Sequence, residues 1–239
     1  MSLVLEKAAK LIELVAHGNE SLSSLATEAG LSKSTAHRIL ATLVAKDYLS
    51  FEERRYKVGY KFLEFGELKR RNFAFVDKLR PITERWVKET NDTMHLALLD
   101  GTEMVLIERQ TGTRQLQIAS YIGQKNPALM TAVGKALVSL QPPHAWGRYL
   151  EDIPSNYSKK KRDIEFELYA AAQNRYAIDI DECSIGTCGI ASTFKTDDGR
   201  DVAVSINGAT VYFKDNRLKK MAPVIKKIAS EMGTLLRSN

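Results

Sequence analysis

The stretch GLSKSTAHRILATLVAKDYL, residues 30–49, decides how the N-terminal part of this chain folds. Its apolar side chains recur at i, i+3, i+4, i+7 and i+8, which predicts a helix beginning at Lys33 with one buried stripe. That stripe consists of Ala36, Ile39, Leu40, Leu43 and Val44. The opposite face carries short or planar hydrogen-bonding side chains, namely Ser34, Thr35, His37, Arg38 and Thr42. A face that only meets solvent carries Glu and Lys more often, so this face is predicted to make a specific contact.

The residues before that helix predict two more helices. Residues 3–16 have an amphipathic pattern, and SLATEAG (residues 24–30) reads as a short helix. Gly30 then supplies a tight turn, and Ser32 is the predicted N-cap of the next helix. Helix, short helix, glycine-containing turn and helix make a helix-turn-helix arrangement.

A hairpin and a helical segment are predicted to follow. YLSFEERRYKVG (residues 48–59) contains two β-prone runs, Tyr48–Phe51 and Tyr56–Val58, around a charged turn, as in a wing. Residues 60–92 are helix-prone, with Pro81 expected in the first turn of a second helix. The aromatic residues of this segment are expected to pack against the wing and a neighbouring subunit.

From Thr93 onward the pattern changes to hairpins and predicts an α+β domain with an antiparallel sheet. Strands are predicted in residues 94–110 (two, around Asp100-Gly101), 114–123 (one) and 188–209 (two, around Asp197-Asp198-Gly199). Helices are predicted in residues 130–140, 163–175 and 216–237. The chain is therefore divided into residues 1–59, a linker of residues 60–92, and residues 93–239.

Composition sets broad limits on function. The chain has 239 residues with 44% hydrophobic and 27% charged residues, and its formal net charge of +6 permits a polyanionic partner. No apolar run approaches the roughly 18 residues that span a bilayer, and the N-terminus lacks the order of a secretory signal. We therefore expect a cytoplasmic protein without a membrane partner. Cys183 and Cys188 are too sparse for a disulfide framework and are expected to be free thiols.

Three segments resemble hallmarks of the IclR family of bacterial transcription regulators, in the family's order. They are GLSKSTAHRIL (30–40), IGQKNPALMTAVGKAL (122–137), and YAIDIDECSIG (176–186) followed by AVSING (203–208). The resemblance implies a winged helix-turn-helix, a linker helix and an effector-binding domain with a GAF-like fold. It also implies a regulator that is not an enzyme and needs no cofactor. Such proteins bind double-stranded operator DNA as dimers or dimers of dimers, and a small organic acid binds the C-terminal domain.

The chemistry of the predicted recognition helix agrees with that resemblance. An α-helix fits the major groove, where an arginine can pair with guanine O6 and N7, so Arg38 is the expected base reader. Free N–H groups and the helix dipole at the N-terminal end favour a phosphate near Ser34 and Thr35. Arg54 and Arg55 at the wing tip can reach the flanking backbone. The predicted DNA contacts are Lys33, Ser34, Thr35, His37, Arg38, Thr42, Arg54 and Arg55.

The resemblance also implies where the effector binds. The matching positions are Ala132 and Val133 in MTAVGK, Asp179 in YAID, and Ser205 and Asn207 in VSING. Backbone N–H groups near Ala132 and Val133, at the start of a helix, favour an anion. Asp179 cannot bind a carboxylate while it is ionised, so we expect it to accept a hydrogen bond from a ligand hydroxyl, unless it serves only as a turn or capping residue.

Two departures from the family pattern bear on the ligand. Arg175 stands where the family usually has Gly, and Gly189 stands where it usually has Cys, with Cys188 just before. Either the strand is shifted by one residue, which turns Cys188 toward the pocket, or the pocket has lost the thiol and gained room, which we favour. Asn207 replaces a common Ser and favours a ligand with more hydroxyls. The similarity to regulators of 2-keto-3-deoxygluconate use favours a sugar-derived acid.

Two other functional classes remain as alternatives to a DNA-binding regulator. One is a cysteine-dependent hydrolase with Cys188 as nucleophile and His95 or His144 as base, although no motif joins these residues. The other is a metal sensor, although no repeated ligand spacing supports it. Its ligands would be drawn from His95, Asp179, Asp181, Glu182 and Cys183.

Overall fold

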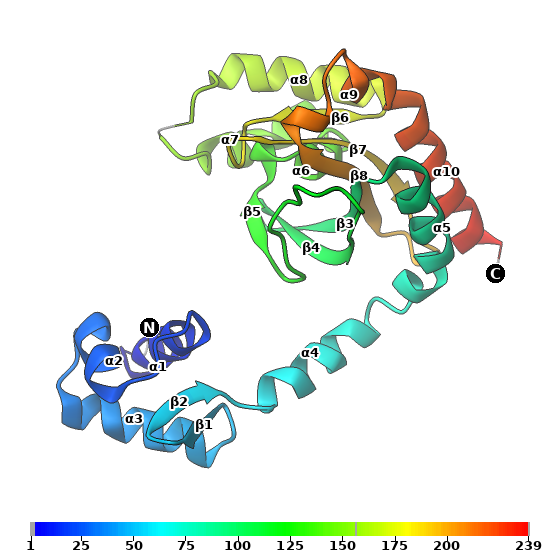
Figure 1. Ribbon diagram of the computed structural model, residues 1–239. Coiled ribbons are helices and arrows are strands. Elements are labelled where there is room, and N and C mark those ends of the chain that lie inside the picture. The colour runs from blue at the N-terminus through cyan, green and yellow to red at the C-terminus, as the bar shows by residue number, and fades with distance from the viewer. Residues whose placement is uncertain (1–2, 156, 239) are drawn as a thin grey trace. The chain divides into compact units, whose positions relative to one another are not determined.

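The computed structural model describes residues 3–155 and 157–238, which form two compact units. The first unit ends at Ala74 and the second begins at Phe75 (Figure 1). This boundary divides the helical segment of residues 60–92 between the two units. Each unit has its own core and is described by itself.

Three helices form the core of the first unit: α1 (Leu3–Ala16), α2 (Leu22–Ala29) and α3 (Lys33–Ala45). Their fully buried leucines, one from each helix, form its core: Leu11, Leu25 and Leu40. Gly30 has a φ of 68° at the end of α2, and the Ser32 side chain accepts a hydrogen bond from the Thr35 N–H at the start of α3. The predicted helix-turn-helix is therefore confirmed.

The wing is an antiparallel pair, β1 (Leu49–Glu52) and β2 (Arg55–Val58). Its turn has only two residues, Glu53 and Arg54, and both have positive φ angles, of 50° and 62°. This left-handed pair matches the twist of a two-residue hairpin, so each strand extends one residue further toward the turn than the sequence predicted.

Helix α4 (Lys61–Arg71) follows the wing and buries none of its described residues. The prediction that its aromatic residues pack against the wing is confirmed at Tyr48, whose ring lies 5.8 Å from that of Phe62 and 6.1 Å from that of Phe65. Tyr60 and Leu63, on the other hand, are 86% and 71% exposed.

The second unit is built on a six-stranded antiparallel sheet with the order β5-β4-β3-β8-β7-β6. The strands are β3 (Thr93–Asp100), β4 (Glu103–Gln110), β5 (Lys125–Pro127), β6 (Ala177–Ile180), β7 (Thr187–Lys195) and β8 (Asp201–Ala209). The predicted antiparallel sheet and α+β class are confirmed. The predicted strand in residues 114–123 is wrong, because β5 takes the place beside β4 and leaves that segment irregular.

Helices cover both faces of this sheet (Figure 1). The helices of this unit are α5 (Phe75–Thr90), α6 (Ala132–Val138), α7 (Gly147–Glu151), α8 (Lys161–Asn174), α9 (Arg217–Lys220) and α10 (Ala222–Arg237), with 3₁₀ turns at Ala128–Met130, Pro143–Ala145 and Thr210–Tyr212. Helix α6 packs against β3, β7 and β8 and also touches α8, whereas α10 packs against β7, β8 and α5. The sheet is therefore the middle of three layers.

Three details of the helices differ from prediction or carry strain. Pro81 lies in the middle of α5 rather than in its first turn, so one backbone hydrogen bond of that helix is missing. The closing helix is split at Met221, because Pro223 starts a new helix. Arg175 ends α8 with a φ of 60°, a left-handed conformation that costs an L-residue about 1–2 kcal/mol.

Candidate functional site

Helix α3 presents the predicted polar face to solvent. Ser34, His37, Arg38 and Thr42 are exposed and Thr35 is half-buried, whereas Ala36, Leu40 and Leu43 are buried. The Ser32 hydroxyl donates to Thr35 Oγ1 at 2.9 Å, and the Thr42 hydroxyl donates to the Arg38 carbonyl at 3.0 Å. Within the described residues, no hydrogen bond or ion pair engages the side chains of Lys33, His37 or Arg38. These three side chains are free to meet a partner.

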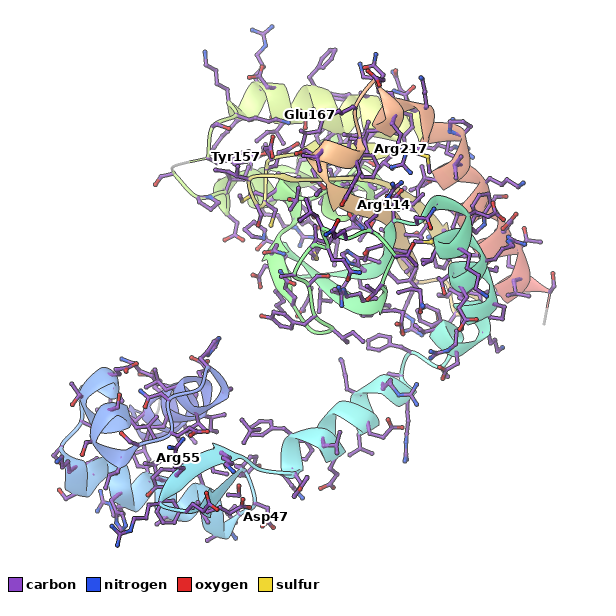
Figure 2. The ribbon with its side chains drawn as sticks, in the orientation of Figure 1. Asp47, Arg55, Arg114, Tyr157, Glu167 and Arg217 are labelled. Carbon is purple, nitrogen blue, oxygen red and sulfur yellow. The ribbon has the colours of Figure 1, made fainter. Side chains whose placement is uncertain are left out.

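The two wing arginines differ in their surroundings. Arg54 lies in the turn and is exposed. Arg55, labelled in Figure 2, belongs to β2 rather than to the tip. Its guanidinium lies 3.0 Å from a Glu20 carboxylate oxygen. The Tyr56 N–H donates to the Glu20 carbonyl as well, so Glu20 holds the wing to the segment before α2. Sequence reasoning missed Glu20, since nothing local marks a contact across 35 residues.

A cavity of about 450 Å³ opens on the α6 side of the sheet in the second unit. The irregular segment between β4 and β5 and the loop before β7 complete its wall. Its apolar lining includes Met104, Leu106, Val133 and Ile118, and its polar lining includes His95, Ser120, Asp179 and Asn207. Of the predicted effector residues, Ala132, Val133, Asp179, Cys188 and Asn207 line this cavity.

Strand pairing places three predicted residues in one row across the sheet. Asp179 of β6 pairs with Gly189 of β7, and Gly189 pairs with Asn207 of β8. A Cβ atom on Gly189 would lie 2.4 Å from Asn207 Oδ1 and 3.2 Å from Asp179 Oδ2. A side chain at position 189 would therefore point at Asn207 and Asp179, although Gly189 itself does not line the cavity and Cys188 does. The room that Gly189 leaves is not empty, however, because the larger Asn207 side chain occupies it.

Asn207 belongs to a chain of hydrogen bonds. Its Nδ2 donates to Ser205 Oγ at 2.6 Å and to His95 Nδ1 at 3.2 Å, and His95 Nε2 lies 3.0 Å from Ser120 Oγ. Because Nδ1 accepts, the imidazole proton is on Nε2 and points to Ser120. Burial and the positive charge of Arg109 lower the pKa of His95 to about 3, so it is neutral. Ser205 is fully buried and does not line the cavity, so it positions Asn207 rather than facing a ligand.

Asp179 occupies part of the predicted anion site. Its Oδ2 accepts the Ala132 N–H at 2.7 Å, while the Thr131 side chain accepts the Gly134 N–H at 3.1 Å. Burial raises the pKa of Asp179 to about 7, and the Ala132 hydrogen bond opposes that rise. Val133 of this first turn also lines the cavity, and its N–H has no acceptor among the described residues. The expectation that both N–H groups await a ligand therefore needs correction at Ala132.

The residues of the two alternative functions are not arranged for chemistry. Cys188 is buried with its Sγ 3.7 Å from the Gly208 carbonyl, and burial raises its pKa to about 12. His95 contacts Asn207 and Ser120 instead of the thiol. Within residues 3–155 and 157–238, no three His, Cys, Asp or Glu side chains converge in a metal-binding group, and neither cysteine is in a disulfide. In the same residues, no helix is long and apolar enough to cross a bilayer.

Comparison with known families identifies the chain. The family model described as the IclR helix-turn-helix domain matches residues 4–53, and the one described as the bacterial transcriptional regulator IclR C-terminal domain matches residues 69–234. The chain belongs to the IclR family of transcriptional regulators. It is therefore a DNA-binding regulator and not an enzyme.

Full-length IclR-family proteins are similar to this chain in sequence and fold. The HTH-type transcriptional regulator KipR of Bacillus subtilis is 25% identical over 235 residues, covering 95% of this chain and 94% of its own. The HTH-type transcriptional regulator KdgR of Escherichia coli is 25% identical over 224 residues, covering 89% and 85%. The crystal structure of Thermotoga maritima IclR has a TM-score of 0.78 at 26% identity, with 98% of both chains covered.

A fourth relative was solved with a small molecule. The crystal structure of an IclR homolog from Microbacterium hydrocarbonoxydans, complexed with 4-hydroxybenzoate, has a TM-score of 0.78 at 19% identity. The match covers 99% of this chain and all of that one. At this identity the likeness establishes the fold of this IclR-family chain.

A buried ion-pair cluster holds the cavity-lining helix of this IclR-family member in place. Lys135 of α6 is 1% exposed and donates to Glu167 at 2.7 Å and to Glu182 at 2.8 Å. Tyr157 and Lys159 also donate to Glu182. Figure 2 labels Tyr157 and Glu167 of this cluster. This cluster joins α6 to the end of β6, where Asp179 lies. Sequence reasoning missed it, although a single Lys inside the apolar run of residues 130–140 is a signal for a buried carboxylate partner.

A second cluster anchors the segment that covers the cavity. Its two arginines, Arg114 and Arg217, are labelled in Figure 2. Arg114 Nε lies 3.1 Å from Asp92 Oδ1, and Arg217 donates to the other carboxylate oxygen. Both arginines donate to the Thr90 carbonyl at the end of α5. Asp92 is fully buried. Since the two arginines are 103 residues apart in the sequence, their meeting at one carboxylate has no local signal.

Proposed function

We propose that this chain reads operator DNA through α3 and the wing and adjusts that binding to a small hydroxylated carboxylate held in the cavity of the second unit. The observation that carries this proposal is the presence in one IclR-family chain of a recognition helix with free donors and a cavity with convergent polar groups. Its site of action is the bacterial cytoplasm.

The DNA contacts are proposed from the exposed donors of α3. Arg38 lies in the second turn, where a recognition helix meets base edges, and its guanidinium matches O6 and N7 of guanine. Ser34 and Thr35 lie at the N-terminal end, where hydroxyls and backbone N–H groups bind phosphate. Lys33, His37 and Thr42 extend the same face, and Arg54 reaches the flanking backbone.

The effector chemistry follows from the donors and acceptors of the cavity. Asn207 uses its Nδ2 on Ser205 and His95, which leaves Oδ1 as an acceptor beside Asp179. Two neighbouring acceptors favour ligand hydroxyls, and the Val133 N–H favours the ligand carboxylate. None of the described lining residues is Phe, Tyr or Trp, so stacking on an aromatic ligand has no support here. We therefore favour an aliphatic hydroxy or sugar-derived acid over an aromatic acid such as the 4-hydroxybenzoate bound by the Microbacterium hydrocarbonoxydans homolog.

The acting form is proposed to be a homodimer or a dimer of dimers. Large apolar side chains of α1 and of the α4 region are exposed in the first unit: Leu3, Val4, Leu5, Tyr60, Leu63 and Leu68. Contact between two copies through such faces removes them from water. It also presents two recognition helices, which need a spacing of about 34 Å to enter successive major grooves.

The experiment that tests the proposal is an operator titration with and without ligand. Purified protein is first screened by thermal shift against hydroxy, keto, sugar and aromatic acids, because a ligand that binds only the native state raises its stability. The best ligand is then titrated against the complex with labelled operator DNA. The variant Asp179→Ala with Asn207→Ala is expected to need at least tenfold more ligand, a loss of about 1.4 kcal/mol, at unchanged ligand-free operator affinity.

Asp163→Ala is the matched control, because it removes an exposed acid of α8 that lies outside the cavity. It should respond at the wild-type ligand concentration. A double variant that also responds there would show that the effector binds elsewhere, and an aromatic acid as the best ligand would overturn the aliphatic class.

A further inference from the structure

A second groove, separate from the effector cavity, lies at the other end of β7. Its volume is about 510 Å³, and its walls come from α6, α8, α10 and the last residues of β7. Strand β6 pairs with β7 only as far as Ala191, so β7 continues along the groove from Ser192 without that neighbour. The helices leave room there because their facing residues are small: Ala136, Ala171, Ala172, Ala229 and Gly233.

The rim of this groove is strongly cationic. Four basic residues line it, Arg175, Lys195, Lys226 and Arg237, against a single carboxylate, Asp201. Lys195 is paired with Asp201 at 2.7 Å. Within the residues that the structure describes, the other three cations have no carboxylate partner, although the Lys226 ammonium lies 5.9 Å from the centre of the Tyr176 ring.

Arg175 occupies a backbone position that suits glycine. It ends α8 with a φ of 60°, and the Ser192 hydroxyl donates to its carbonyl at 2.7 Å, which fixes this residue beside β7. Strain of this kind in a residue that lines a groove points to a function for its side chain. Across the groove, Arg237 Nη2 lies 3.7 Å from the position of a Cβ atom on Gly233, so its guanidinium folds back over α10. A Cβ atom at position 233 would be in ordinary van der Waals contact with that guanidinium.

We propose that Arg175, Lys226 and Arg237 form a second binding site, for a small organic polyanion with two or more phosphate or carboxylate groups. Three unpaired cations from two sides of one groove match several negative charges rather than one. The hydroxyls of Ser139, Ser230 and Thr193 add hydrogen-bonding groups to the lining. This site goes beyond the proposed function, since it shares no lining residue with the effector cavity.

The test is calorimetric titration of the full chain with citrate and with pyrophosphate, at fixed ionic strength and with acetate as the monoanion. Arg175→Gly is the decisive variant, because it removes the guanidinium and relieves the left-handed strain, so it should unfold at the same temperature or higher. Arg175→Lys keeps the charge and the strain. Arg162→Gln removes an exposed arginine of α8 outside the groove and is the matched control.

The proposal expects citrate, pyrophosphate or both to bind more tightly than acetate. Affinity should fall at least tenfold in Arg175→Gly and in Lys226→Gln, and stay within twofold of wild type in Arg175→Lys, Arg162→Gln and Asp179→Asn. All of these variants leave the first unit unaltered, so polyanion binding to the DNA-reading surface cancels in the comparison. Equal affinity in Arg175→Gly and Arg162→Gln would overturn the site, as would loss of binding in Asp179→Asn, which would place the anion in the effector cavity. Absence of binding by either polyanion would overturn it as well.

Discussion

The recognition face of α3 uses residues 33–42 alone, whereas the effector cavity collects side chains from β3, β4, β6, β8, α6 and the loops between them. In α3 one helical turn after another places donors on the same side, so spacing along the chain is enough to build the face. In the cavity, Asp179, Gly189 and Asn207 meet only because three strands pair in one register. The recognition face therefore needs only the helical spacing of α3, whereas the cavity needs the strands of the sheet to pair in the correct register.

The largest expected effect tests whether the two units are independent. Gly59 and Gly134 are a matched pair, because a Cβ atom on either would lie 2.1 Å from a backbone oxygen, of Asp47 or of Ala128. Gly134→Ala should lower the free energy of unfolding of the second unit by about 3 kcal/mol, since backbone on both sides must move. Gly59→Ala should do the same to the first unit only.

Tryptophan fluorescence distinguishes unfolding of the second unit from unfolding of the first. Both tryptophans, Trp86 and Trp146, belong to the second unit, whereas far-ultraviolet circular dichroism reports helices of both. In denaturant titrations, Gly134→Ala should shift the fluorescence transition and Gly59→Ala should not. Equal shifts of that transition in both variants would show that the two units unfold together and are not independent.

The same contrast explains what the sequence could predict. The helix that begins at Lys33, its Ser32 cap and the Gly30 turn follow from local spacing and were all correct. The segment of residues 114–123 looks like a strand by itself, but its place beside β4 is taken by β5, and only strand pairing decides that competition. The space beside Gly189 likewise depends on Asn207, 18 residues further along, whose amide fills the gap that a missing side chain suggested.

The next effect concerns base reading by α3. Arg38→Ala should lose about 1–3 kcal/mol of binding to operator DNA while binding to scrambled DNA changes little, because a lost base contact affects only the specific complex. Arg38→Lys should not restore the preference, since an ammonium lacks the planar fork of a guanidinium. Fluorescence anisotropy measures the affinity of each variant for operator and for scrambled DNA. Lys10→Ala, which removes an exposed lysine of α1, is the control. Equal losses on both DNAs would assign Arg38 to a phosphate.

A smaller effect concerns the pH dependence of the second unit. Burial raises the pKa of Asp179 from 3.8 to about 7, so between these values the folded chain holds a proton that the unfolded chain has released. Stability should therefore fall as pH rises through this window, with a slope of at most about 1.4 kcal/mol per pH unit from this group. The charged groups near Asp179 are Lys135 of α6, Lys159 of the loop between α7 and α8, and Glu182 after β6.

Asp179→Asn should remove the contribution of this carboxyl to the slope of stability against pH, because an amide does not titrate. The amide oxygen can still accept the Ala132 N–H. Denaturant titrations followed by tryptophan fluorescence at pH 5 and pH 7.5 compare the slopes. Asp163→Asn on the exposed face of α8 is the control and should keep the wild-type slope. An unchanged slope in Asp179→Asn would mean that this carboxyl stays ionised throughout.

The smallest effect distinguishes the two wing arginines. Arg55 is paired with Glu20, but its side chain is 66% exposed, so Arg55→Ala should cost less than about 1 kcal/mol of stability. Arg54 lies in the two-residue turn and is the one offered to the DNA backbone. Each phosphate contact adds about 0.9 to the slope of log affinity against log salt concentration. Arg54→Ala should therefore reduce that slope by nearly one, and Arg55→Ala should leave it unchanged, since its guanidinium is already neutralised within the protein. If Arg55→Ala reduces the slope instead, DNA must take Arg55 away from Glu20, and Glu20→Gln should then strengthen binding to operator and scrambled DNA alike.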